Sequence, residues 1–294
     1  MELNFDFFSP EQVLNLPIAD SKKVKISIKR DDLIHPYISG NKWRKLKHLL
    51  IKAKQDKKTH VVTFGGAWSN HLLATACAAA TFKFSSTAYI RGEKVTNPVL
   101  SLCKLFGMNI HFVDREDYKN KDLLFKKYHG ADSSAFFINE GGYSLEAAKG
   151  CEEIITELKN NYDHIFAACG TGATLAGLAK GASIYQTHAI VHGVPVLKGG
   201  DFIQDAVHRL YPQINVKLHC TYHFGGYAKT KPELIDFIKE FCKETGVLIE
   251  PTYTGKLFYA VVDLLSKDYF KEGDHILIVH SGGLTGFLGQ YLKF

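Results

Sequence analysis

Residues 165–178 read IFAACGTGATLAGL, and this stretch decides the fold class. The apolar run from Ile165 to Ala168 has the length and composition of a buried strand. It leads into the turn Gly170-Thr171-Gly172, after which small and apolar residues open a helix at Ala173 and Thr174. A strand that enters a helix through a glycine turn is typical of a parallel α/β sheet. Backbone N–H groups, two threonine hydroxyls and the positive end of a helix dipole meet at this turn, which suits a phosphate group.

The same turn does not match the common nucleotide motifs. It lacks the Gly-Lys-Ser/Thr ending of a P-loop, and Leu175 stands where a dinucleotide fingerprint has its third glycine. On its own, the stretch therefore indicates a phosphate site without naming the ligand.

Other short strands alternate with helical patterns along most of the chain. We expect them at Val61–Phe64, Thr87–Ile90, Ile110–Val113, Phe136–Ile138, Ile190–Val194 and Ile276–Val279. This alternation predicts βαβ units on mostly parallel sheets, with the chemistry carried by loops at strand ends. Earlier in the chain, Val24, Ile26 and Ile28 alternate with Lys and Ser, which predicts a half-exposed edge strand.

Composition excludes several functional classes. The 294 residues are 46% hydrophobic, enough for two modest lobes or one large α/β domain with a substantial core. The formal net charge is +6, but the lysines are scattered among acidic residues and form no basic stripe. We therefore expect no nucleic-acid partner.

Cysteine usage and the absence of apolar spans indicate a compartment. The six cysteines include no C-x-x-C pair and mostly lie in apolar segments, which is typical of reduced core residues. The segment Met1–Pro10 lacks a basic start followed by an apolar run, and no stretch is long enough to cross a bilayer. We expect a cytoplasmic protein with no membrane partner.

A lysine follows a second glycine turn, in Gly40-Asn41-Lys42. Apolar residues then repeat at helical spacing, at Trp43, Leu46, Leu49, Leu50 and Ala53. Lys42 is therefore expected in the first turn of a helix, where the helix dipole and the nearby cations Arg44 and Lys45 would lower its pKa. The neutral amine, which forms imines, would be favoured. The alternative is an ordinary solvated lysine.

Residues 63–72 read TFGGAWSNHL, a strand that passes through two glycines into a helix with Ser69 or Asn70 at its start. Such a helix end offers N–H groups and a favourable dipole to a carboxylate. The alternative is a capped helix without further function. Ser69 lacks the flanking glycines of a hydrolase nucleophile elbow, which disfavours that class of enzyme.

Two more segments place hydroxyl groups at loop or strand ends, namely EPTYTGK at 250–256 and LIVHSGG at 277–283. By position alone, Tyr253 and Tyr227 would be packing aromatics.

Two histidine pairs at a spacing of four, His188 with His192 and His219 with His223, suggest a metal at first sight. Their local patterns are those of strands or loops, and no carboxylate completes either set. We assign no metal.

Five motifs, taken in order, resemble the 1-aminocyclopropane-1-carboxylate deaminase and D-cysteine desulfhydrase family. They are Gly40-Asn41-Lys42-x-Arg44-Lys45-Leu46, Gly65-Gly66-x-x-Ser69-Asn70, Gly170-Thr171-Gly172-x-Thr174, Tyr253-Thr254-Gly255-Lys256 and His280-Ser281-Gly282-Gly283. The match runs from about residue 24 to residue 290, and five motifs in the right order are far more specific than any one of them.

The resemblance implies the tryptophan-synthase-β-like fold, known as fold type II of the pyridoxal-phosphate enzymes. This is an α/β fold of two lobes, with parallel-rich sheets flanked by helices and pyridoxal 5'-phosphate between the lobes. By this resemblance, residues 1–47 and 160–294 would form the large cofactor-binding lobe and residues 48–159 the small lobe. A homodimer acting on a small amino acid is also implied.

The resemblance also assigns roles to residues. Lys42 would form the Schiff base, Asn70 would contact the phenolic oxygen of the cofactor, and the turn Gly170-Thr171-Gly172-Ala173-Thr174 would hold its phosphate. Ser69 would meet the substrate carboxylate or act as a nucleophile. Tyr227 and Tyr253 would be the two active-site tyrosines.

Two positions depart from the deaminase pattern. Thr254 stands where the deaminases carry a Glu that keeps the ring nitrogen of the cofactor protonated. A hydroxyl from Thr254 or Ser281 would leave this nitrogen neutral and the ring a weaker electron sink. His71 replaces the usual Gln, in the substrate pocket, and its imidazole is expected to titrate near neutral pH.

The threonine at position 254 favours β-elimination, because this reaction expels its leaving group promptly and needs less carbanion stabilisation than cyclopropane opening. Our hypothesis is a pyridoxal-phosphate lyase in which Lys42 removes the α-proton and a group such as sulfide leaves. The first alternative is cyclopropane deamination to 2-oxobutanoate, in which Tyr253 or Ser69 attacks the ring. Dehydration of a serine-type substrate also remains open. A catalytically silent cofactor-binding or regulatory protein is the alternative from another class.

Overall fold

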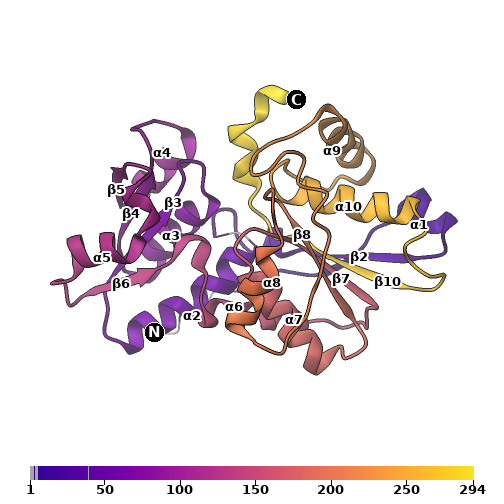
Figure 1. The fold of residues 1–294 in the computed structure, drawn as a ribbon, viewed down its shortest axis with the longest axis horizontal. Helices are drawn as coiled ribbons and strands as arrows, with labels where there is room; N and C mark the ends of the chain where they lie inside the picture. Colours follow the sequence, from indigo (N-terminus) through magenta and orange to yellow (C-terminus); the bar gives the residue numbers. More distant parts are fainter. Residues whose placement is uncertain (1–2, 4–5, 39) are drawn as a thin grey trace.

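A computed structural model describes residue 3, residues 6–38 and residues 40–294. Two sheets organise these residues (Figure 1). The larger has the strand order β1-β2-β10-β7-β8-β9, and the smaller has the order β5-β4-β3-β6. Every neighbouring pair is parallel except β1 with β2. The predicted parallel α/β architecture is therefore confirmed.

The strands of the larger sheet are β1 (Glu11–Val13), β2 (Lys25–Lys29), β7 (His164–Cys169), β8 (Ile190–Pro195), β9 (Lys217–Leu218) and β10 (His275–Val279). Helices α1 (Pro17–Ser21), α9 (Pro232–Thr245) and α10 (Thr254–Ser266) contribute to one core cluster with this sheet. Helices α6 (Leu145–Thr156), α7 (Ala173–Tyr185) and α8 (Phe202–Leu210) contribute to a second. The sheet is thus buried between two helical layers, as its apolar strands require.

The strands of the smaller sheet are β3 (His60–Gly65), β4 (Ser85–Arg91), β5 (Met108–Val113) and β6 (Ala135–Ile138). Its helices are α3 (Asn70–Phe82), α4 (Pro98–Leu105) and α5 (Lys121–His129), and α2 (Asn41–Gln55) packs against α6 and α3. Short 3-10 turns complete the chain at η1 (Asp31–Leu33), η2 (Asp117–Lys119), η3 (Glu140–Gly142), η4 (Leu284–Gly289) and η5 (Tyr291–Lys293). In Figure 1 the smaller sheet lies in the left body and the larger sheet in the right body.

The strand around Ile26 is not the edge strand that the alternation predicted. β2 pairs with β1 on one side and with β10 on the other. Of the polar residues that suggested exposure, Lys25 is exposed, but Ser27 and Lys29 are buried. Ser27 is hydrogen-bonded to His275 at 3.0 Å, and Lys29 pairs with Glu157 at 2.9 Å. The sequence pattern predicted a half-exposed strand because Glu157, the ion-pair partner of Lys29, lies 128 residues away in the sequence.

The lobe boundaries stay a prediction. We propose residues 1–47 with 160–294 as the large lobe and residues 48–159 as the small lobe, so that the first boundary falls within α2. Within the described ranges, no helix has the length and apolar character needed to span a membrane.

Candidate active site

Lys42 is the second residue of α2, as predicted, and the start of this helix is held against the end of β10. Gly40 has a φ of 62°, and a Cβ atom there would lie 1.9 Å from the carbonyl oxygen of Ser281. The N–H of Asn41 donates to that same oxygen at 3.3 Å. Only glycine allows this approach, which brings the helix start next to Ser281 of the predicted site.

The amine of Lys42 is linked to the predicted phosphate turn. Its Nζ donates to Oδ1 of Asn41 at 2.7 Å, and Nδ2 of Asn41 donates to Oγ1 of Thr174 at 2.9 Å. Burial first, and then the charge of Lys45, lower the pKa of Lys42 to about 7. About half of the molecules therefore carry a neutral Lys42 amine at pH 7. The predicted direction of the shift agrees, although burial is its main cause.

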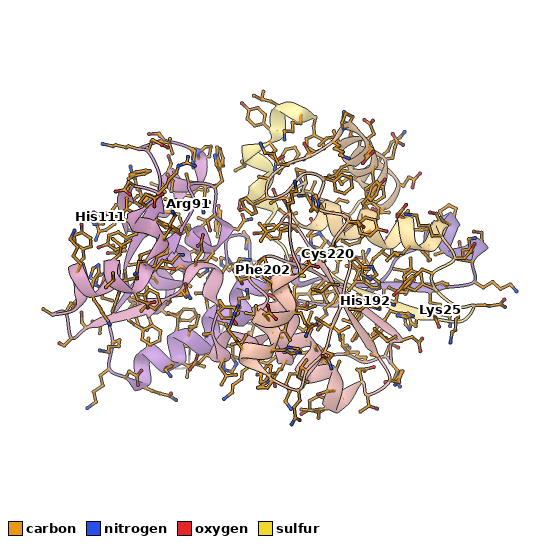
Figure 2. The ribbon with its side chains drawn as sticks, viewed as in Figure 1. Lys25, Arg91, His111, His192, Phe202 and Cys220 are labelled. Atoms are coloured by element: carbon orange, nitrogen blue, oxygen red, sulfur yellow. The ribbon has the colours of Figure 1, made fainter. Side chains whose placement is uncertain are left out.

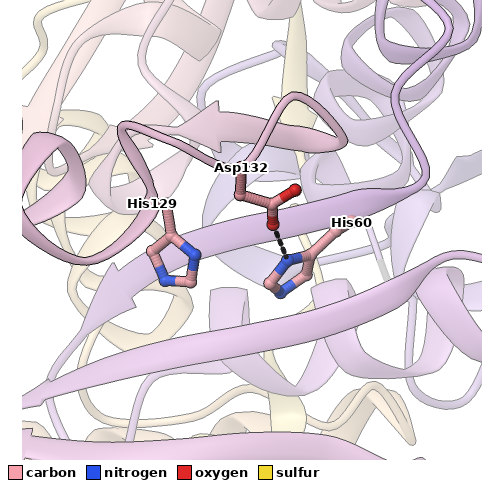
Figure 3. Close-up of side chains that lie close together, drawn as sticks. All are labelled: His60, His129 and Asp132. Atoms are coloured by element: carbon pink, nitrogen blue, oxygen red, sulfur yellow. Dashed lines mark hydrogen bonds and ion pairs between the residues drawn. The ribbon is translucent and has the colours of Figure 1, made fainter.

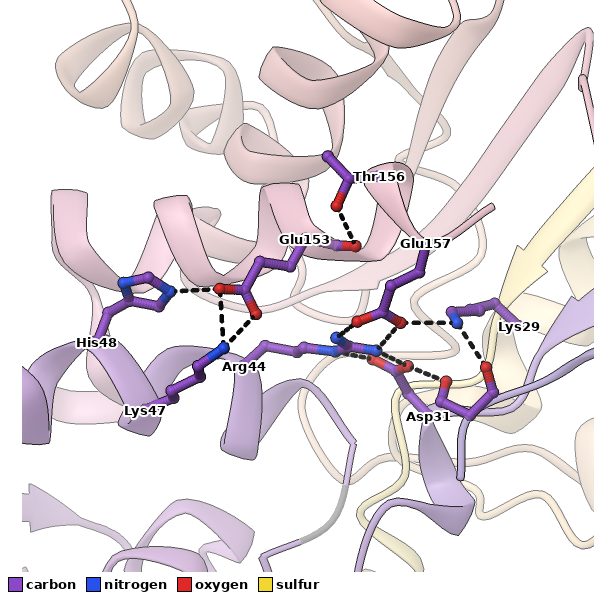
Figure 4. Close-up of polar contacts among 9 residues, drawn as sticks. Lys29, Asp31, Arg44, Lys47, His48, Glu153, Thr156 and Glu157 are labelled. Atoms are coloured by element: carbon purple, nitrogen blue, oxygen red, sulfur yellow. Dashed lines mark hydrogen bonds and ion pairs between the residues drawn. The ribbon is translucent and has the colours of Figure 1, made fainter. Parts of the chain in front are cut away.

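The predicted contribution of Arg44 to this shift is wrong, because its charge is neutralised elsewhere. The guanidinium donates to both carboxylate oxygens of Asp31, at 3.1 and 2.8 Å, and to Glu157 at 2.8 Å (Figure 4). The side chains of Arg44 and Asp31 are only 1% and 0% exposed. Arg44 thus fixes α2 to η1 and α6, two residues after Lys42.

Ser69 and Asn70 lie where the glycine loop after β3 enters α3. Ser69 is the N-cap residue and Asn70 the first helical residue, as expected, but the Ser69 hydroxyl does not cap the helix. The side-chain oxygen of Asn70 accepts a hydrogen bond from Thr285. Lys42 and Asn70 line one narrow cavity together with Pro36, Tyr37, Gly283, Leu284 and Thr285. The structure therefore brings these two predicted site residues together.

The predicted phosphate turn joins β7 to α7, with Gly172 as the N-cap residue at a φ of 94°. A Cβ atom on Gly170 would lie 3.4 Å from the ring of Tyr253. Thr171 lies against η3, since a Cβ atom on Gly141 would be 3.0 Å from its methyl group. The first N–H groups of α7, beginning at Ala173, have no partner within the helix. The turn is therefore next to both Tyr253 and the asparagine that holds Lys42.

Tyr227 and Tyr253 pack edge to face with ring centroids 6.0 Å apart. Burial raises the pKa of both phenols, so both are protonated at neutral pH. The loop before Tyr227 is held by the buried ammonium of Lys256, which donates to the carbonyl oxygens of His223 at 2.8 Å and Gly226 at 2.7 Å. The motif lysine is therefore a positioning residue for one of the tyrosines.

His71 does not titrate near neutral pH as predicted. It is 2% exposed, and burial together with the charges of Lys42 and Lys45 lowers its pKa to about 3. The Thr63 hydroxyl donates its proton to the carbonyl oxygen of Ile138. The Thr63 Oγ1 atom therefore accepts a hydrogen bond from Nε2–H of His71 at 2.9 Å. Nδ1 of His71 is then a buried acceptor, and it has no partner among the described residues.

The Thr254 hydroxyl was expected to face the cofactor ring nitrogen, but it bonds to the backbone of Glu250, whose carboxylate lies beside it. Thr254 is fully buried, and its hydroxyl accepts from the N–H of Glu250 at 2.8 Å. The Glu250 carboxylate is buried in turn and accepts from the N–H groups of Thr252, Tyr253 and Thr254 at 2.6–3.0 Å. Its pKa is raised by burial, and its charge acts on Lys42. Sequence reasoning missed Glu250, although the Glu-Pro pair before the motif was visible.

A second feature that sequence reasoning missed is a basic cavity beside the glycine loop. It encloses about 620 Å³ and is lined by Arg91, Arg115, Tyr118, Lys119, Lys121 and Glu140. Arg91 lies on the body that holds the smaller sheet (Figure 2), and a Cβ atom on Gly66 would be 4.0 Å from its Nη2 atom. Its charge also influences the pKa of Tyr227. The cavity therefore adjoins the predicted site.

The two histidine pairs do not form sites of their own. His192, labelled in Figure 2, bonds instead to His164 on β7 and to His219, both at 3.0 Å. His188 is exposed, and His223 accepts from the N–H of Gly225 at 2.9 Å. The imidazoles of His192, His219 and His223 are therefore engaged in local hydrogen bonds, and those of His192 and His219 also stack on Phe166.

The residues gathered here fit pyridoxal phosphate. The site offers a lysine amine with a pKa near 7, a glycine turn at a helix start, and a buried acceptor on His71 that has no partner among the described residues. The aldehyde of the cofactor would react with the lysine amine, and its phosphate would bind at the glycine turn. A hydrogen-bond donor of the cofactor or the substrate would meet the acceptor on His71. The roles of the individual residues toward the cofactor stay predictions.

Comparison with known proteins supports this fit. The sequence profile of the family described as "Pyridoxal-phosphate dependent enzyme" matches residues 9–282. A relative from Arabidopsis thaliana, named "Bifunctional D-cysteine desulfhydrase/1-aminocyclopropane-1-carboxylate deaminase, mitochondrial", is 31% identical over 88% of this chain and 72% of its own length.

Solved structures give the same result. A structure described as "ACC deaminase homologue" superposes with a TM-score of 0.85 and 28% identity, covering 100% of this chain and 94% of its own. Threonine deaminase isoform 2 from Solanum lycopersicum shares the fold, with a TM-score of 0.70 and 16% identity over 97% of this chain and 82% of its own. The two-lobed fold type II is therefore confirmed.

The cofactor of this enzyme is pyridoxal phosphate, and its chemistry is that of a lyase or deaminase. The chain belongs to the pyridoxal-phosphate-dependent enzymes, in the family of 1-aminocyclopropane-1-carboxylate deaminase and D-cysteine desulfhydrase.

Proposed function

We propose that the enzyme catalyses β-elimination on a small amino acid, with D-cysteine as the preferred substrate. D-cysteine and water would give pyruvate, hydrogen sulfide and ammonia. The observation that carries the proposal is the amine of Lys42, which has a pKa near 7 and lies at the cavity that it shares with Asn70. Such an amine accepts a proton from the α-carbon at neutral pH. The cyclopropane substrate has no α-proton to remove.

Lys42 would take the α-proton on Nζ, while Ser69 and the start of α3 bind the substrate carboxylate. Pyridoxal phosphate, when bound, supplies the electron sink that acidifies the α-carbon. The carbon–sulfur bond then breaks with its electron pair on sulfur. Tyr227 and Tyr253 are protonated, so either phenol can give the departing sulfur a proton.

The remaining side chains would position the cofactor and the substrate. We propose that Gly170–Thr174 hold the phosphate and that Asn70 bonds the phenolic oxygen. Ser281 would face the ring nitrogen, because the Thr254 hydroxyl is engaged with Glu250. His71 would accept a hydrogen bond from the substrate or the cofactor through Nδ1.

Deamination of the cyclopropane amino acid to 2-oxobutanoate and ammonia is the second candidate. Two observations favour it: the name of the Arabidopsis relative carries both activities, and the Ser69 hydroxyl is not used to cap α3. In that reaction Ser69 or Tyr253 would attack the ring.

The test is to measure sulfide and pyruvate from D-cysteine, and 2-oxobutanoate from the cyclopropane amino acid, with the cofactor-loaded protein. L-cysteine serves as the stereochemical control. Lys42→Ala should abolish turnover, whereas Lys52→Ala, on the exposed side of the same helix, should not. Release of 2-oxobutanoate without sulfide would reject elimination in favour of the second candidate.

We further propose a homodimer in the cytoplasm. All six cysteines are unpaired, which suits a reducing compartment. The dimer rests on the family resemblance. Sedimentation of the loaded protein tests it, and a monomer at enzyme concentrations would reject it.

A further inference from the structure

Three potential metal ligands meet at the amino-terminal end of the smaller sheet. His60 is the first residue of β3, His129 is the last residue of α5, and Asp132 lies in the turn before β6. Nδ1 of His60 is 3.1 Å from Oδ2 of Asp132, and one ligand atom from each of the three residues lies within 4.8 Å of the others. Figure 3 shows His129 with a ring nitrogen turned toward this pair.

The outer atoms of the two imidazoles are already bonded. Nε2 of His60 pairs with the hydroxyl of Thr87 at 2.9 Å, and Nε2 of His129 pairs with the hydroxyl of Tyr89 at 3.0 Å. These contacts orient the two rings, so that the Nδ1 atom of each ring remains available to the cluster of His60, His129 and Asp132. Such second-shell bonds orient imidazole ligands in metal sites.

The carboxylate is oriented in the same way. Oδ1 of Asp132 accepts from the N–H and the hydroxyl of Ser134, at 2.9 and 2.6 Å, so that Oδ2 remains for an ion.

We propose that His60, His129 and Asp132 bind one divalent transition-metal ion, with zinc as the reference ion. Zinc binds imidazole nitrogen and carboxylate oxygen at about 2.0–2.2 Å in tetrahedral geometry, so neighbouring ligand atoms stand about 3.4 Å apart. The His60–Asp132 pair is already close to this spacing, and the ligand atom of His129 lies within 4.8 Å of both. Water would fill the fourth position.

The site is separate from the catalytic centre. His60 begins β3, and the glycine loop that leads to Ser69 follows the other end of the strand at Gly65. The five intervals between these six residues, at about 3.3 Å each, put roughly 16 Å between the two ends. The ion would therefore cross-link the α5–β6 turn to β3 and stabilise this part of the fold, without taking part in the elimination. The histidine pairs considered from sequence contribute no ligand to it.

The test is zinc binding by the holoenzyme, measured by equilibrium dialysis with metal analysis. We expect one zinc per chain, and affinity at least about tenfold weaker in His60→Gln, His129→Gln and Asp132→Asn, because each removes a ligand. His188→Gln, an exposed histidine elsewhere, is the matched control and should bind as wild type does. Magnesium should not bind, because it prefers oxygen ligands.

Failure of wild type to bind zinc, or equal affinity in wild type and the three ligand variants, would overturn the proposal. Asp132 lies in a surface turn, so Asp132→Asn decides the matter if a histidine variant fails to fold. Elimination activity should be unchanged within twofold by zinc removal. A loss of activity on zinc removal would overturn the separation of this site from the catalytic centre.

Discussion

The reactivity of Lys42 with pyridoxal phosphate should depend on pH with a midpoint near 7. Burial and the charge of Lys45 lower the pKa of Lys42 to about 7. At pH 7 about half of the amines are then neutral, against about 0.03% for a lysine with the ordinary value of 10.5, a ratio of roughly 1,600. Since only the neutral amine attacks an aldehyde, imine formation at Lys42 should be faster than at an exposed lysine, by up to about this factor.

The sign of the pH dependence follows from the lowered pKa. The rate of imine formation should rise between pH 6 and 8 and then level off, whereas an exposed lysine would keep gaining reactivity up to about pH 10. Lys45→Met removes a like charge, so the pKa of Lys42 should rise and the midpoint should move to higher pH. Each unit of that rise lowers the neutral fraction below the midpoint about tenfold.

The assay is rapid mixing of the apoprotein with pyridoxal phosphate, followed by absorbance, with borohydride trapping and intact mass as a second readout. Lys45→Arg keeps the charge and should preserve the profile. Lys52→Met removes an exposed amine on the same helix, paired with Glu146 at 2.9 Å, and should change nothing. A midpoint near 10 in wild type, or the same midpoint in a folded Lys45→Met variant, would refute the reasoning.

Three further substitutions test the surroundings of the site. Arg44→Met leaves Asp31 buried without its counter-charge, so we expect the free energy of unfolding in urea to fall by about 3–5 kcal/mol. Lys256→Met removes the ammonium that holds the loop before Tyr227, and should lower kcat by more than tenfold with little change in cofactor affinity. His71→Gln should leave the kcat/KM profile between pH 5 and 8 unchanged in shape, because His71 has a pKa of about 3 and is already neutral there.

Each of these has a matched control. Lys23→Met removes one partner of an exposed pair with Glu272 and should not change stability measurably, so an equal loss in Lys23→Met and Arg44→Met would argue against the buried network. Lys256→Arg keeps the charge and should retain part of kcat, while a fully active Lys256→Met would remove the positioning role. A step near pH 6.5 that wild type shows and His71→Gln lacks would contradict the buried, neutral imidazole.

The positions of the strands along the chain and of the glycine turns could be predicted because they depend on local pattern. The apolar run before Gly170 and the helical repeat after Lys42 each lie within about fifteen residues, and the structure has both elements at these places. Periodicity of this kind reports which face of an element is buried. The motifs could be assigned to the site from the sequence, because functional residues in parallel sheets lie in the loops after the carboxyl ends of the strands.

The environments of individual charges could not be predicted, because their partners are distant in sequence. Arg44 was expected to repel Lys42, but it pairs with Glu157, 113 positions later. His71 was expected to titrate, but the fold buries it against Lys42, Lys45 and Thr63. Burial and partner charges decide a pKa, and both are properties of the assembled fold.

Residues brought together across the chain were also invisible from sequence. Asn41 meets Thr174 over a separation of 133 residues, and His60 meets Asp132 over 72. No spacing rule links such positions. Glu250 was passed over for a related reason, since its carboxylate acts at the start of α10 only once three N–H groups converge on it.

The central claim is that Lys42 holds the cofactor and provides the proton acceptor. It is tested most directly by reducing the holoenzyme with borohydride and mapping the modified lysine by peptide mass spectrometry, with and without prior turnover of D-cysteine. We expect the label on Lys42, in stoichiometric amount, and less of it when substrate occupies the cofactor. A label on Lys45, Lys256 or another lysine, or full elimination activity in Lys42→Ala, would contradict the account.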